Sequence, residues 1–148
     1  MKETELLESA LSSIKTDEQF LVLHKRLSEV DVETVFVGLW QTALAGRGNS
    51  ASVQASRMLV ALQPDAPRSL EELIRDIHAS KLDASNRLVP FYLVTQFGKH
   101  AVTVEALRFL DELPIGSDRS RVECVNYWAS APAELLCQPL HDWRDSGD

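Results

Sequence analysis

Residues 31–44, with the sequence DVETVFVGLWQTAL, carry the clearest structural signal in the chain. Apolar residues recur there at three- and four-residue spacing, which is the period of an α-helix with one buried face. The members of this stripe are Val32, Val35, Phe36, Leu39, Trp40, Ala43 and Leu44. Asp31 precedes the stripe at the N-cap position, where its carboxylate can accept a hydrogen bond from the first turn. The stretch therefore predicts a helix that buries Trp40 in a core instead of presenting it to a ligand.

The same spacing extends through nearly the whole chain, and it places Leu6 on the apolar stripe of the first helix and Val104 and Leu107 on that of the seventh. No run shows the two-residue alternation of a half-buried strand. Thr16 with Gln19 and Ser69 with Glu72 have the spacing of capping boxes, which mark helix starts. Ser117-Asp118 is the predicted cap of the eighth helix. Helices are predicted to begin near residues 3, 16, 31, 51, 69, 85, 101 and 118, with a ninth from Pro132. Residues 88–94 are apolar on nearly all sides, so a buried strand is the alternative there. The fold class predicted is all-α, with eight or nine helices stacked as antiparallel pairs.

The helix starts repeat at about 33 residues, a period typical of stacked helical hairpins. The repeats would occupy residues 31–64, 69–98 and 101–130. Their second helices begin alike, with Ser56-Arg57-Met58-Leu59, Asn86-Arg87-Leu88-Val89 and Ser120-Arg121-Val122. On these residues the chain resembles short HEAT-like α-solenoid proteins, a resemblance that implies an open surface for binding another protein. An irregular helical bundle is the alternative architecture.

Size and charge narrow the possible functions. The chain has 148 residues, of which 45% are hydrophobic and 25% charged, as expected for one globular domain over 1–148. Its formal net charge is −7, the opposite of what phosphate neutralisation requires, so nucleic acid is an unfavoured partner. No stretch of 18 apolar residues and no basic, apolar leader occurs, and the cysteines Cys124 and Cys137 have no nearby partner. These features predict a cytoplasmic protein without a membrane segment.

No motif of high specificity for catalysis or metal binding occurs in the sequence. The loop at residues 46–51 matches G-x-G-x-x-A, but it follows a helix instead of a strand, so it predicts an ordinary connection. The histidines and cysteines lack partners at metal-ligand spacing. We therefore expect no enzyme activity and no cofactor or metal. The alternative is a helical enzyme whose site assembles from scattered residues such as His78, Arg87 and Glu123.

The class favoured by these observations is a non-catalytic module that binds another protein, most simply a basic one. Small acidic helical proteins of this kind resemble the immunity proteins that neutralise bacterial toxins. The C-terminal third combines an apolar anchor, Trp143, with carboxylates that can steer a basic partner. The predicted partner-binding residues are Arg57, Arg87, Arg121, Glu134, Asp142, Trp143 and Asp145. A structural subunit that oligomerises through Leu136, Leu140 and Trp143 is a further alternative.

Overall fold

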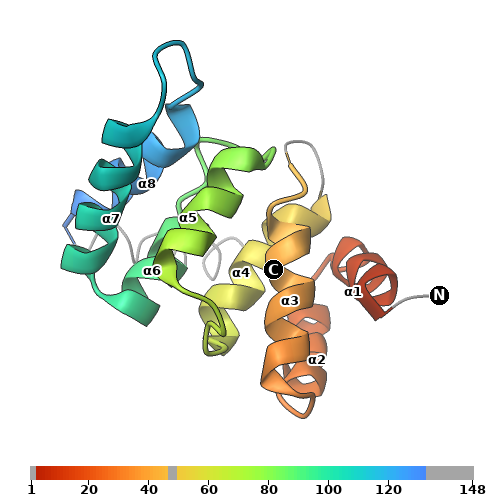
Figure 1. Cartoon of the computed structure of the whole chain (residues 1–148). Helices are drawn as coiled ribbons and strands as arrows, with labels where there is room; N and C mark the ends of the chain where they lie inside the picture. The colour runs from red at the N-terminus through yellow and green to blue at the C-terminus, as the bar shows by residue number, and fades with distance from the viewer. Residues whose placement is uncertain (1–2, 47–49, 133–148) are drawn as a thin grey trace.

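A computed structural model describes residues 3–46 and 50–132, and these residues form eight α-helices and no strand. The helices are α1 (Glu3–Ser12), α2 (Asp17–Leu27), α3 (Val32–Ala43), α4 (Ser50–Leu62), α5 (Leu70–Ala79), α6 (Leu88–Phe97), α7 (Lys99–Glu112) and α8 (Ser120–Ser130). In Figure 1 the chain progresses across the molecule from α1–α3 on the right to α7 and α8 on the left. The all-α prediction is confirmed. The ninth predicted helix lies outside the described residues apart from Pro132.

The helix starts follow the capping signals in the sequence. Thr16 and Gln19 form a reciprocal pair, with Oγ1 of Thr16 accepting from the Gln19 amide at 3.2 Å and Oε1 of Gln19 accepting from the Thr16 amide at 3.1 Å. Asp31 Oδ2 accepts from the Thr34 amide at 3.1 Å. The predicted cap at residues 117–118 is wrong, because α8 begins at Ser120. Asp118 instead accepts from the amide and hydroxyl of Ser120, which closes a turn before the helix.

The helices pack as two close pairs and one row of three helices. Helix α3 packs on α4 and α7 packs on α8, while α4, α6 and α8 contact one another in succession. We call α4, α6 and α8 the inner layer. Each of the three predicted repeat ranges contains two helices, although α7 begins two residues before its range. Helix α5 has its main contacts with α7 and α8 instead of α6, so the middle pair is not a tight hairpin. The repeat itself stays a prediction.

An aromatic cluster joins the middle of the chain to its first half. The Trp40 ring is 3% exposed and stacks on Phe36 at 5.6 Å between centroids, and Tyr92 of α6 lies 6.1 Å from Phe36 and 6.4 Å from Trp40. The buried Tyr92 hydroxyl donates to the Pro64 carbonyl at 2.6 Å, and burial raises its pKa. The core placement of Trp40 is therefore confirmed, and residues 88–94 belong to a helix, not a strand.

Four residues predicted to lie on buried stripes are instead about half exposed. They are Leu6, Val32, Val104 and Leu107. Helix α7 buries a different face, with Val102, Ala106 and Leu110 at four-residue spacing toward its neighbours. The reason is tertiary: α7 contacts α5, α6 and α8, and the apolar residues outside that arc remain at the surface.

Candidate protein-docking groove

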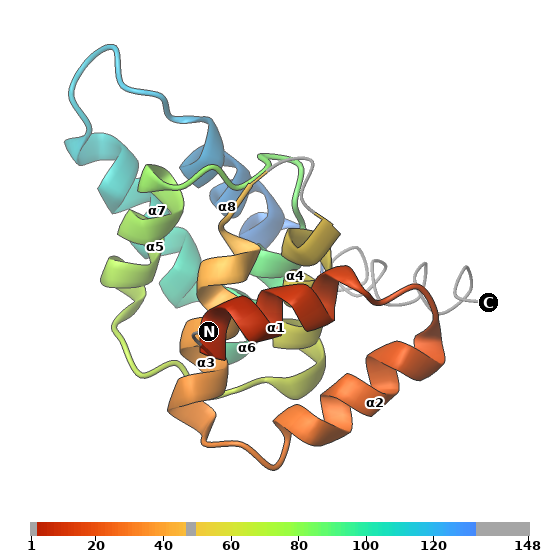
Figure 2. The same ribbon diagram turned by 90° about the vertical axis from the view of Figure 1, so that its right-hand side faces the viewer.

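A long groove separates the first three helices. It is bounded by α1, α2 and α3 and has a volume of about 910 Å³. Figure 2 looks toward this part of the molecule, with α1 in front of α3 and α2 set apart below it. The residues lining the groove are Leu6, Leu7, Ala10, Leu23, Arg26, Leu27, Val30, Asp31, Glu33, Thr34, Val35, Val37 and Gly38. We call this the α1–α3 groove.

Unequal packing of the N-terminal helices leaves the groove open. Helix α1 packs on both α3 and α4, whereas α2 has its main helix contact with α4 alone. At Gly38 of α3 the α1 helix comes so close that an added Cβ would lie 2.6 Å from Cδ2 of Leu7. The close approach of α1 to α3 at one edge, with α2 held away at the other, creates a hollow that the side chains of the described residues do not fill.

The walls of the α1–α3 groove carry apolar side chains at the surface. Leu6 is 56% exposed, Val30 44% and Val37 39%, while Leu7, Leu23 and Leu27 are half-buried between them. Four more exposed apolar residues lie outside the groove lining, on α2, α3 and α4. They are Leu21, Val22, Val32 and Val53. Isolated exposed apolar residues are normal, but a contiguous apolar hollow of this kind is characteristic of a surface that binds something.

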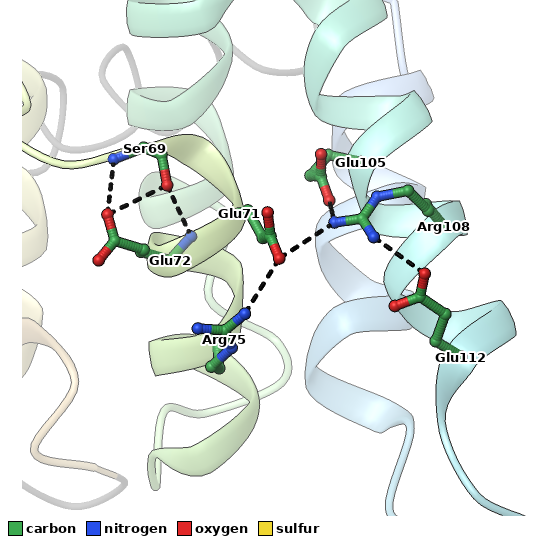
Figure 3. Close-up of polar contacts among 7 residues, drawn as sticks. All are labelled: Ser69, Glu71, Glu72, Arg75, Glu105, Arg108 and Glu112. Carbon is green, nitrogen blue, oxygen red and sulfur yellow. Dashed lines mark hydrogen bonds and ion pairs between the residues drawn. The ribbon is translucent and has the colours of Figure 1, made fainter.

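The acidic residues near the groove differ in their contacts from those on α5 and α7. Figure 3 shows Arg108 reaching from α7 to three carboxylates: Glu105, Glu112 at 2.9 Å and Glu71 of α5 at 3.5 Å. Glu71 also accepts from Arg75 at 3.0 Å. Each of these acids forms an ion pair within the molecule. Their ion pairing contrasts with the surroundings of the acids near the groove.

Three exposed acids surround the end of the groove at the turn between α2 and α3. Asp31 and Glu33 line it, and Glu29 is exposed beside Val30. Among the described residues, none of the three forms an ion pair. Arg26 on α2 is the one basic residue in the described lining of the groove. Residues 3–43 as a whole carry eight acidic and three basic side chains.

The arginines predicted to bind a partner lie in or next to the inner layer but have separate surroundings. Arg57 of α4 is half-buried, which lowers its pKa, and the charge of Asp17 partly offsets that effect. The Arg87 guanidinium, just before α6, lies over the Trp128 ring at 5.5 Å from its centroid. Arg121 of α8 lies 3.4 Å from Asp118. Arg87 and Trp128 thus form a contact between the start of α6 and α8 that the sequence did not predict. Partner binding by the three arginines stays a prediction.

Four of the predicted partner-binding residues lie outside the described residues. They are Glu134, Asp142, Trp143 and Asp145. The same holds for Arg47 in the predicted interhelical loop and for the apolar residues Leu136 and Leu140 of the oligomerisation alternative. Partner binding by these C-terminal residues therefore stays a prediction.

The residues of the enzyme alternative have separate contacts. The His78 ring packs on Phe109 at 5.2 Å between ring centroids, and its buried Nδ1 has no hydrogen-bond partner among the described residues. Glu123 lies 3.7 Å from Arg119, and Arg87 lies over Trp128. In the described part of the chain, no group of three or more His, Cys, Asp or Glu residues is arranged to hold a metal ion.

No protein-family model, curated protein or solved structure matched this chain. The resemblance to HEAT-like proteins accordingly stays a prediction. None of the helices in residues 3–46 and 50–132 combines the length and apolarity that a membrane crossing requires.

Sequence reasoning missed the α1–α3 groove, although a signal for it was present. Helix α3 carries Val35, Phe36 and Val37 in succession; Val35 and Val37 line the groove, whereas Phe36 is in the core. Three consecutive apolar residues span about 200° of a helix, more than a single neighbouring helix can cover. The apolar residues in excess of one face therefore marked α3 as having a second, unfilled contact.

Proposed function

We propose that this chain is a non-catalytic protein-binding module whose α1–α3 groove docks a segment of a partner protein. The observation that carries the proposal is the exposure of Leu6, Val30 and Val37 along one continuous hollow. Burying apolar area of this kind on association is favourable by roughly 25 cal/mol per Å² before the costs of binding are subtracted. A basic partner suits the acidic surroundings of this groove and the net charge of −7.

A pair of matched double variants tests the groove. Leu6→Ser with Val37→Ser removes two of its exposed apolar side chains, while Val104→Ser with Leu107→Ser removes two exposed apolar side chains from α7. Surface substitutions of this kind change stability by about 0.5 kcal/mol or less, so both variants should remain folded. The free energy of unfolding of each, followed by circular dichroism, is the control.

The native cell provides the partner by co-purification with the intact chain. A partner retained by the parent and by the α7 variant, but lost from the groove variant, supports the proposal. Binding of that purified partner should weaken about tenfold or more in the groove variant, equivalent to about 1.4 kcal/mol. Equal binding by the parent and the groove variant would contradict docking at this surface.

The narrower form of the proposal is an inhibitor that neutralises its target, as immunity proteins do. The acidic balance supports a basic target, and a free-standing binding domain is sufficient for this role. Titrating the intact chain against the activity of the co-purified partner tests it. Inhibition that requires an intact groove is the expected result, and binding without any loss of the partner's activity would contradict the inhibitor role.

A further inference from the structure

We infer that the occupant of the α1–α3 groove is an amphipathic helix of the partner whose basic residues meet the turn between α2 and α3. This inference rests on the proposed function and specifies the docking mode and the charge of the docked segment. It follows from the chemistry that the groove walls offer and from the charges left without partners at one end.

The walls favour a helix over the other common forms of peptide recognition. An added β-strand needs an unpaired sheet edge, and the described residues contain no strand. A polyproline segment docks between aromatic rings, whereas the described residues that line this groove include no aromatic side chain. Recognition of a phosphate or acidic motif needs a cluster of arginines, and the described lining contains Arg26 alone. A helix laid between helices requires only apolar walls, which Leu6, Leu27 and Val37 help to provide.

The charges select a basic helix. Glu29, Asp31 and Glu33 are exposed at one end of the groove and form no ion pair with any described residue. Lysine or arginine side chains of the partner would gain Coulomb attraction there without breaking an existing pair. Acidic side chains at the same end would be repelled. Asp31 also caps α3 through the Thr34 amide, so its carboxylate is held in place at the rim.

Two synthetic peptides of about 18 residues, about five helical turns, test the inference on the intact chain. Both carry leucines at i, i+3, i+4 and i+7, and their polar positions are filled with lysine in one and glutamate in the other. Fluorescence anisotropy measures binding at about 0.05 M and about 0.5 M salt, which shortens the Debye length from roughly 14 Å to about 4 Å. At low salt we expect the lysine peptide to bind about tenfold tighter than the glutamate peptide. At high salt we expect the two affinities to converge.

Two double variants separate the contribution of charge from that of apolar contact. The rim variant changes Glu29 and Glu33, and the wall variant changes Leu6 and Val37. Glu29→Gln with Glu33→Gln should weaken the lysine peptide about three- to tenfold and leave the glutamate peptide unchanged or slightly tighter. Leu6→Ser with Val37→Ser should weaken both peptides. Asp111→Asn, which removes one exposed carboxylate of α7 away from the groove, is the charge control and should leave both affinities unchanged.

The outcomes distinguish this inference from the proposed function. Equal binding of the two peptides, with both weakened by the wall variant, overturns the basic selection and leaves groove docking intact. Equal weakening by Asp111→Asn and by the rim variant overturns it as well, since attraction would then be unspecific. Failure of both peptides to bind at millimolar concentration overturns helix docking, while the co-purified partner still tests the proposed function independently.

Two other occupants are further outcomes. If a second copy of the chain fills the groove, sedimentation of the parent shows a dimer that the wall variant loses. If residues 133–148 fill it, Leu136→Ser with Leu140→Ser in the intact chain tightens lysine-peptide binding. Either result overturns the inference that the site is reserved for a partner helix.

Discussion

Trp40 is held by a polar contact as well as by packing, and this contact can be measured. Its Nε1–H donates to Oδ2 of Asp76 at 3.0 Å, which links α3 to α5. Arg68 donates to the same carboxylate, with Nη2 to Oδ1 at 3.2 Å. The Asp76 side chain is about one-third exposed, whereas the Trp40 ring is buried. We therefore expect Trp40 and Asp76 to be energetically coupled.

The structure sets the expected magnitudes. A hydrogen bond to a charged group stabilises a fold by about 1.5–3 kcal/mol, and partial exposure of Asp76 reduces this to about 1–2 kcal/mol. Trp40→Phe removes that bond and part of the ring, so it should destabilise by about 2–3 kcal/mol. Trp40→Ala, which leaves a cavity beside Phe36 and Tyr92, should cost about 3–5 kcal/mol.

A double-mutant cycle with Trp40→Phe and Asp76→Ala isolates the bond. The free energy of unfolding of the parent, both single variants and the double variant is measured by chemical denaturation, followed by circular dichroism because tryptophan fluorescence changes with the substitution. The coupling energy should be about 1–2 kcal/mol. Trp128→Phe is the matched control, since that half-buried ring lies under Arg87 and its replacement should cost about 1 kcal/mol or less.

Two results would refute the reasoning. Additivity of the two substitutions within about 0.5 kcal/mol would show that the hydrogen bond contributes nothing. A loss below about 1 kcal/mol for Trp40→Ala would show that the ring is not a buried part of the core.

Acid titration, thiol alkylation and charge neutralisation test three other parts of the chain. Burial alone would raise the pKa of Asp76, but hydrogen bonds from Arg68 and Trp40 outweigh it and hold the pKa below its usual range. Because the pKa is lower in the folded than in the unfolded state, this contribution is present above the unfolded value of about 3.9 and is lost as the pH falls through the folded value. Urea unfolding should therefore show a smaller decrease below about pH 5 in Asp76→Asn than in the parent, and parallel profiles would contradict it. Burial raises the pKa of the Cys124 thiol, so a Cys137→Ser chain should react with iodoacetamide more slowly at pH 7.5 than a free cysteine peptide does, and an equal rate would contradict the burial. Neutralising the tail acids should slow association with the co-purified partner and flatten its salt dependence, whereas an unchanged association rate would place the steering charges elsewhere. The tail substitutions are Glu134→Gln, Asp142→Asn and Asp145→Asn.

Local information was sufficient to determine the helices of this protein. Thr16, Asp31 and Ser69 each accept a hydrogen bond from an amide three residues away, and the apolar period that follows each cap is a property of adjacent residues. The burial of Trp40 could also be predicted, because it lies at the centre of the longest apolar stripe. For α8 the local signal was ambiguous, since Asp118 uses its carboxylate to form a turn before the helix begins.

Only the tertiary structure decided which apolar residues are buried and where a partner can dock. Leu6 and Val104 lie on predicted stripes, yet both are about half exposed, because burial depends on where the neighbouring helices end up. The α1–α3 groove exists because α1 closes on α3 at Gly38 while α2 is held mainly by α4. The spacing of residues within one helix sets the direction of its apolar face, but the distance between two helices depends on all the contacts around them.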